Sequence, residues 1–285
     1  MKIGLVLGGG GSRGFAHAGV LQVLHREKIP IDFIVGTSMG AIIGVIYSLG
    51  MPPDEIAEGL KREMGKESPN SPLRSLSMLT STARQRRLER LIEPHIGSKT
   101  FADLTIPVTV MTVDMVKGEE VAIQSGPLVP TLLASSAVPG VFPPVKINGR
   151  PLSDGGVIDS LATHVATKQG ADKIIAVDVY PKLEEEALWS DPVSDIIGLQ
   201  WATTIFGQGE NERAPHMASV MWRSVRVMTW HLHQKRLCEH PPDIYMRPEV
   251  DTLGSLDFTA MEEPIQAGIR EAEKYLAELH ALVQK

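Results

Sequence analysis

The pentapeptide Gly36-Thr37-Ser38-Met39-Gly40 carries the strongest chemical signal in the sequence. A serine between glycines at a strand-to-helix junction forms a sharp turn with its hydroxyl at the apex. The glycines permit strained backbone angles and let the helix pack closely against the strand. The helix that follows brings the positive end of its dipole to the place where negative charge would develop. The motif therefore predicts that Ser38 is a nucleophile.

A glycine loop directly after the first apolar segment is the second signal, with the sequence Gly8-Gly9-Gly10-Gly11-Ser12-Arg13-Gly14. Such a loop exposes several backbone N–H groups toward one point, which suits an anion. The spacing also fits a dinucleotide loop, but that loop expects an acidic residue at the end of the second strand, and Asp32 lies at its beginning. No Gly-Lys-Ser/Thr follows, which excludes a P-loop. We expect an oxyanion hole, with this loop and the serine turn at the same edge of a parallel sheet.

The third signal is Ser153-Asp154-Gly155-Gly156, which alone would indicate only a turn. In this order and at these approximate separations, the three segments together resemble the patatin-like phospholipase family. That family is characterised by a glycine-rich oxyanion loop with Arg or Lys, a G-x-S-x-G serine and an Asp-Gly-Gly or Asp-Gly-Ala aspartate. The resemblance extends through residues 134–144, which precede the aspartate, and through residues 170–178. It covers about residues 3–180.

The resemblance implies a serine acyl hydrolase with Ser38 as nucleophile and Asp154 as general base, without a histidine, a metal or a cofactor. An ordinary aspartate is a weak base, so Asp154 must lie close to the serine and be partly desolvated. The family commonly has Asn and Pro a few residues later, where this chain has Ser160 and Ala162, so we expect a local change at that helix start. The remaining implied site residues are the oxyanion donors Gly9, Gly10 and Gly11, the loop supports Arg13 and Gly14, and the motif glycines Gly36, Gly40, Gly155 and Gly156.

Other readings of the same residues remain open. A Ser-His-Asp triad in the order serine, acid, histidine would need a residue such as His164 or His231. We interpret His164 as structural or exposed, and two of the three residues His231, His233 and His240 as surface residues. An acyltransferase of the related G-x-S-x-G fold and a non-catalytic lipid-binding regulator are the further alternatives to hydrolysis.

The order of strand-like and helix-like segments indicates how these residues are positioned. Strands alternating with helices predict a three-layer α/β/α fold with a largely parallel central sheet. The expected strands are residues 2–7, 32–35, 107–113, 120–124, 145–147, 151–153 and 173–179. The expected helices run to about residue 28, over 41–49, from 53 onward, and over 83–93, 128–137 and 161–169.

After residue 181 the pattern becomes helical. A linker at 184–186, two helices within 192–237 and a final helix are expected, with no obvious strand. The final helix has one apolar stripe that should pack on the core, made of Ile265, Ile269, Ala272, Leu276, Leu279 and Val283. We expect a single patatin-like domain over 1–285, with a catalytic core at 1–180 and a helical portion at 181–285 covering it.

Composition limits the classes of partner. The formal net charge of −6 gives no overall attraction to nucleic acid. Cys238 is the single cysteine, so no intrachain disulfide or cysteine-based zinc site can form. The N-terminus has no signal-peptide core, and the charge-free residues 33–53 read better as strand, turn and helix than as a membrane span. We expect a cytoplasmic protein, with acyl lipid as substrate and peripheral contact with a membrane.

Several segments could serve a lipid substrate. Residues 67–82 read as a surface loop that could act as a lid, and the basic row from Arg84 to Arg90 reads as a solvated helix face. Residues 196–201 and an apolar stripe could line an acyl-chain groove, and Trp222 and Trp230 could touch a membrane interface. We favour core packing between helices for the stripe, whose members are Met221, Val225, Met228 and Leu232.

Overall fold

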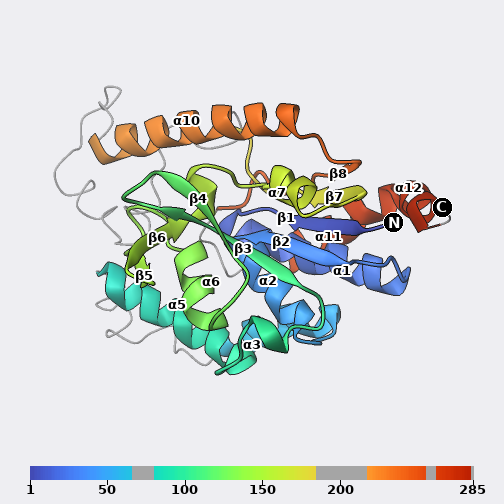
Figure 1. Ribbon diagram of the computed structural model, residues 1–285, viewed down its shortest axis with the longest axis horizontal. Coiled ribbons are helices and arrows are strands. Elements are labelled where there is room, and N and C mark those ends of the chain that lie inside the picture. Colours follow the sequence, from blue (N-terminus) through green and yellow to red (C-terminus); the bar gives the residue numbers. More distant parts are fainter. Residues whose placement is uncertain (66–79, 184–216, 255–260, 284–285) are drawn as a thin grey trace, which may run out of the picture.

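The computed structural model describes residues 1–65, 80–183, 217–254 and 261–283. An eight-stranded sheet lies at the centre, with helices on both faces (Figure 1). The strand order is β5-β6-β3-β2-β1-β7-β8, and β4 pairs with β3 off this path. This arrangement confirms the predicted layered α/β fold. The strands are β1 (Ile3–Leu7), β2 (Phe33–Thr37), β3 (Val108–Asp114), β4 (Glu119–Ile123), β5 (Val145–Ile147), β6 (Arg150–Asp154), β7 (Lys173–Val177) and β8 (Ile244–Met246).

The middle of the sheet is parallel. Neighbouring pairs among β3, β2, β1, β7 and β8 are all parallel, whereas β4 and β6 run antiparallel to β3. Every residue of β1, β2 and β3 is buried, because helices cover both faces. Such strands read as continuous apolar runs, which is why they were visible in the sequence. Along β1, Leu5 and Leu7 face one core and Val6 faces the other.

Most helices cover the first of these two faces. The core there joins residues of α1, α2, α3, α5, α6 and α11, and the smaller core on the opposite face joins α7 to the sheet. In Figure 1, α10 lies beyond α7 on that opposite side. The helices are α1 (Ala16–Arg26), α2 (Met39–Ser48), α3 (Pro53–Gly65), α5 (Ser81–Ile96), α6 (Leu128–Ser135), α7 (Thr163–Lys168), α10 (Met217–Glu239), α11 (Glu262–Lys274) and α12 (Leu276–Val283).

The C-terminal region departs from the expectation at three points. The strand β8 joins the sheet beside β7, although no strand was predicted after residue 181. The final helix is interrupted at Tyr275 and forms α11 and α12. Val283 is 45% exposed, so the last member of the predicted stripe does not pack on the core. The strand β8 was not predicted because its three residues are too few to show an alternation of apolar and polar residues.

The structure also tests the predictions for residues 33–53 and for the basic row from Arg84 to Arg90. Residues 33–53 do form a strand, a turn and a helix, and none of the described helices has the length and hydropathy needed to cross a bilayer. The basic row is not wholly solvated, because Arg84 is buried and its Nε donates to the Val141 carbonyl at 2.8 Å. Burial lowers the pKa of Arg84. The linker, residues 196–201 and nearly all of the loop 67–82 lie outside the described residues.

Candidate active site

Ser38 occupies the turn between β2 and α2, as the motif predicts. Its backbone has φ 53° and ψ −121°, a strained conformation for a residue with a side chain, of the kind that costs about 1–3 kcal/mol. The flanking glycines make this turn sterically feasible. A Cβ at Gly36 would lie 2.6 Å from Ala41 Cα, and a Cβ at Gly40 would lie 2.2 Å from the Leu7 carbonyl oxygen. The start of α2 therefore packs directly on the end of β1.

The sheet register brings the glycine loop and the serine turn together. In the parallel pair β1–β2, Leu7 lies opposite Gly36. Both strands therefore end at the same edge of the sheet, as expected for neighbouring parallel strands. A Cβ at Gly9 would lie 3.3 Å from Ser38 Cβ, so the loop backbone lies against Ser38.

A buried serine outside the motifs holds the Ser38 backbone. The Ser38 N–H donates to Ser135 Oγ at 2.8 Å, and the Ser135 hydroxyl donates to the Met111 carbonyl at 2.7 Å. Ser135 ends α6 and is fully buried. Sequence reasoning missed this role, although two consecutive serines at the end of an apolar helix were a signal that could have raised it.

Asp154 reaches Ser38 from the antiparallel side of the sheet. It ends β6, opposite Thr112 of β3, and is 6% exposed. Its carboxylate accepts hydrogen bonds from the Ser38 hydroxyl and, at 2.8 Å through Oδ1, from the Gly156 N–H. Burial raises the pKa of Asp154 to about 6, although the two hydrogen bonds act to lower it. This carboxylate is a stronger base than an exposed aspartate and remains ionised at neutral pH.

The other motif glycines allow close approach to this pair. A Cβ at Gly155 would lie 2.9 Å from the backbone of Met111, and a Cβ at Gly14 would lie 2.4 Å from Met39 Cγ. Gly14 thus lets the 3₁₀ turn η1 (Gly11–Phe15) pack on the start of α2. Arg13 is buried in the same turn.

Hydrogen bonds fix the glycine loop from three sides. The Gly8 N–H donates to the Val177 carbonyl and the Gly9 N–H to the Ser160 carbonyl, both at 3.0 Å. Ser160 Oγ donates to the Gly9 carbonyl at 2.9 Å. His17 Nε2 lies 2.7 Å from the Gly8 carbonyl oxygen, and burial lowers the pKa of His17 to about 4, so this histidine is neutral. Because the Gly9 N–H donates to the Ser160 carbonyl, it already has a hydrogen-bond acceptor.

Gly10 and Gly11 are placed differently from Gly9. Gly10 precedes η1 and Gly11 is its first residue, so their N–H groups have no acceptor within that turn. Across the described ranges, neither group has a backbone acceptor elsewhere. Gly11 has φ 62°, which favours glycine at this position. Neither N–H group is therefore occupied by a backbone carbonyl of the described residues.

The two departures from the family pattern lie at the start of α7. Ser160 contacts Gly9 through both its hydroxyl and its carbonyl. Ala162 is the N-cap of α7 and provides no side-chain cap. Ser160 therefore connects the segment after Asp154 to the glycine loop, a contact that the sequence alone did not predict.

The described histidines do not complete a triad with Ser38. His17 pairs with the Gly8 carbonyl, His164 lies between Glu120 and Asp159, and His233 Nε2 lies 2.9 Å from Asp178 Oδ2. These are the three buried histidines of the described chain. His231 is exposed and His240 is half-buried.

The apolar stripe on α10 differs from the favoured interpretation. Met221 and Met228 are more than 60% exposed and Val225 is 40% exposed, so these three residues do not form a core between helices. Trp230 stacks on Tyr180 with their planes 9° apart. These three members lie at the surface of the described structure, and Leu232 is half-buried.

Comparisons with known proteins agree with this architecture. A lysophospholipase NTE1 of Yarrowia lipolytica is 31% identical over 97% of this chain, and an uncharacterised NTE family protein of Mycobacterium bovis is 36% identical over 62%. The chain spans only 19% and 49% of those relatives. VipD of Legionella pneumophila shares the fold, with a TM-score of 0.53 and 15% identity over 97% of this chain and 67% of that one. The family model for patatin-like phospholipases matches residues 5–167, and the chain belongs to that family.

Proposed function

We propose that this protein is a serine acyl hydrolase that cleaves carboxylic ester bonds of phospholipids, lysophospholipids or related acyl lipids. The observation that carries the proposal is the hydrogen bond between the Ser38 hydroxyl and the buried Asp154 carboxylate. Family membership and the similarity to proteins named lysophospholipase support an acyl lipid as the substrate.

In the first half-reaction, Asp154 takes the Ser38 proton while Oγ attacks the ester carbonyl carbon. The carbonyl electron pair moves onto oxygen, and the resulting oxyanion accepts hydrogen bonds from loop amides. We assign Gly10 and Gly11 as these donors and give Gly9 a positioning role, because its N–H is bonded to Ser160. Each well-placed donor is worth about 3 kcal/mol.

The tetrahedral intermediate then collapses. The bond to the leaving oxygen breaks, Asp154 returns the proton to that oxygen, and the acyl group remains on Ser38. Water gives its proton to Asp154 as it attacks the acyl-serine, and breakdown of the second intermediate releases the fatty acid and restores the serine.

Peripheral contact with a lipid surface is part of the proposal. Met217, Met221 and Met228 are all more than 60% exposed on α10, and unbranched methionines adapt to an apolar surface. Replacing Met221 and Met228 by Ser should reduce sedimentation with lipid vesicles and leave hydrolysis of a dissolved short ester unchanged. Equal vesicle binding by the double variant would remove α10 from the proposal.

The test of function compares Ser38→Ala and Asp154→Ala with the wild type on a p-nitrophenyl ester and on lysophosphatidylcholine. Ser48→Ala is the matched control, because Ser48 is buried at the end of α2 and its Oγ has no partner within the described structure. Both site variants should lose at least about 10³-fold in kcat, and the control should keep its rate. Wild-type rates in Ser38→Ala would refute the mechanism.

Product analysis separates the alternatives. Transfer of the acyl group to an added alcohol in preference to water would identify an acyltransferase. Lipid binding by a folded wild-type protein that hydrolyses no ester would instead favour a regulator.

A further inference from the structure

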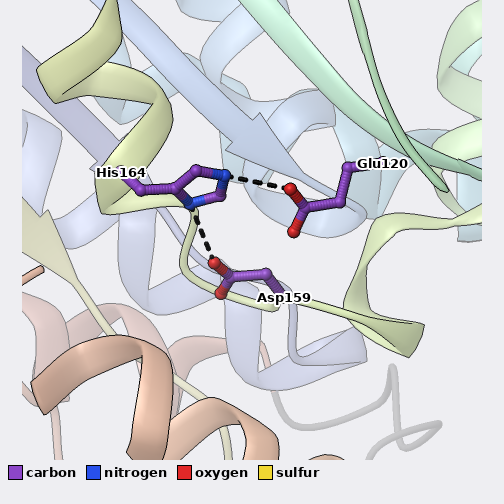
Figure 2. Close-up of side chains that lie close together, drawn as sticks. All are labelled: Glu120, Asp159 and His164. Atoms are coloured by element: carbon purple, nitrogen blue, oxygen red, sulfur yellow. Dashed lines mark hydrogen bonds and ion pairs between the residues drawn. The ribbon is translucent and has the colours of Figure 1, made fainter. Parts of the chain in front are cut away.

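His164 is buried between two carboxylates close to the proposed site (Figure 2). Its Nε2 lies 3.0 Å from Glu120 Oε2, and its Nδ1 lies 3.2 Å from Asp159 Oδ2. The three residues come from different segments: Glu120 from β4, Asp159 from the connection between β6 and α7, and His164 from α7 itself. The imidazole ring therefore connects three pieces of backbone.

The charges around the ring favour its protonated form. The neighbouring carboxylates of Asp159 and Glu120 raise the pKa of His164 to about 9, against the opposing effect of burial. The bond to His164 in turn lowers the pKa of Glu120. From α10, Arg236 Nη2 lies 3.5 Å from Glu120 Oε1, and beyond α10 the His240 ring lies 5.7 Å from the His164 ring. Lys168 of α7 adds a further positive charge near Glu120.

A metal ion fits this cluster poorly. One ligand atom from each of Glu120, Asp159 and His164 lies within 4.8 Å of the others. A metal would need both carboxylates to converge on one ring nitrogen, whereas each carboxylate faces a different one (Figure 2). A protonated imidazole also has no lone pair to offer. The geometry is that of a clamp in which the ring makes a hydrogen bond to Glu120 and an ion pair with Asp159.

The clamp holds the segment that runs from Asp154 to Ser160, the residue that contacts the glycine loop. Asp159 follows Asp154 by five residues, and its N–H donates to the Gly155 carbonyl at 3.0 Å. Its other oxygen, Oδ1, accepts the Leu161 N–H at 3.0 Å. The residue between them, Ser160, is the one that bonds Gly9 through two hydrogen bonds.

We propose that His164 is a positioning residue, which ties Asp159 to Glu120 and thereby holds Asp154 and the glycine loop in place against Ser38. The inference rests on the proposed dyad for its catalytic consequence, but its structural part stands independently. The clamp touches no reacting atom, so it acts on kcat through geometry and leaves substrate affinity unchanged.

The first experiment measures kcat, KM and their pH dependence for His164→Gln, which removes the charge of the ring. The control is His280→Gln, since His280 also pairs with a glutamate, Glu27 at 3.1 Å, but on the surface. In His164→Gln, kcat should fall about ten- to hundredfold with KM unchanged. Wild-type kcat should fall above pH about 9 as His164 loses its proton, and the variant should lack this alkaline limb. An unchanged kcat, or the same alkaline limb in the variant, would overturn the proposal.

The second experiment is hydrogen exchange of the peptides that contain residues 8–14 and 155–162, with β3 as the internal reference. Both peptides should exchange faster in His164→Gln while β3 does not change. If His164→Gln fails to fold, Glu120→Gln provides the same comparison with a milder change. Unchanged exchange in both peptides refutes the clamp whatever the activity. Faster exchange in a protein without Ser38-dependent hydrolysis would retain the clamp and reject the proposed function.

Discussion

Replacing Asp154 by Asn should stabilise the protein while abolishing its activity. Burial raises the pKa of Asp154 from 3.8 to about 6, so the folded protein binds this proton more tightly than the unfolded chain. The contribution of Asp154 to stability is therefore fully present below pH 3.8 and is lost as the pH rises through about 6. At about 1.4 kcal/mol per unit of pKa, the ionised carboxylate destabilises the fold by about 3 kcal/mol at pH 8.

Asparagine has the shape of aspartate and no charge to lose. Its oxygen can accept the Gly156 N–H, and its amide can donate to Ser38 Oγ. The free energy of unfolding of Asp154→Asn should therefore exceed that of the wild type by up to about 3 kcal/mol at pH 8 and by about half as much at pH 5. The corresponding rise in Tm at pH 8 is roughly 5 °C.

Denaturant unfolding at pH 5 and pH 8 measures this difference directly. The matched control is Asp54→Asn in the exposed first turn of α3, which should change stability by less than about 1 kcal/mol. The wild-type kcat/KM should rise with pH through about 6, because only the ionised Asp154 can accept the Ser38 proton. A variant no more stable than the wild type at pH 8, or a gain that does not shrink at pH 5, would refute the reasoning.

Two further substitutions, Gly40→Ala and Ser135→Ala, test the packing around Ser38. Gly40→Ala should destabilise the fold by at least about 3 kcal/mol in thermal unfolding, because the new Cβ would lie 2.2 Å from the Leu7 carbonyl oxygen. Gly44→Ala, one turn further along α2, meets no atom closer than 3.1 Å and should stay within about 1 kcal/mol of wild type; equal effects of the two would contradict the steric argument. Ser135→Ala should cost about 1–3 kcal/mol and lower kcat about tenfold, since it leaves the buried Ser38 N–H without its acceptor. Unfolding and steady-state kinetics on one sample check both effects, and an unchanged kcat would remove Ser135 from the support of the turn.

The parts of the structure that the sequence predicted are those encoded locally. The strand, turn and helix around Ser38 could be predicted because the glycines on either side of the serine and the apolar run beside them are local features, each only a few residues long. The sequence also predicted that the glycine loop and the serine turn lie at one sheet edge, because each follows one of two consecutive strands, β1 and β2, that were expected to be parallel. The proposed role of Asp154 came from the family resemblance, since nothing local distinguishes it from a turn residue.

The parts that the sequence did not predict depend on distant contacts. Ser135 and Ser160 are short polar residues whose roles exist only once β3 and the glycine loop lie beside them. Arg84 is buried because α5 meets residues more than fifty positions away, which a row of arginines cannot reveal. The stripe on α10 has the spacing of a core-facing helix, yet its methionines face outward. Periodicity shows that a helix has an apolar face and does not show what lies against that face.

The central claim is that Ser38 becomes acylated during turnover. Acid quenching of the protein during hydrolysis of a slow long-chain ester, followed by peptide mass spectrometry, tests it most directly. We expect an acyl adduct on the peptide that contains Ser38, formed at a catalytically competent rate in the wild type and absent in Ser38→Ala. An adduct on another residue, or undiminished hydrolysis by Ser38→Ala, would contradict it.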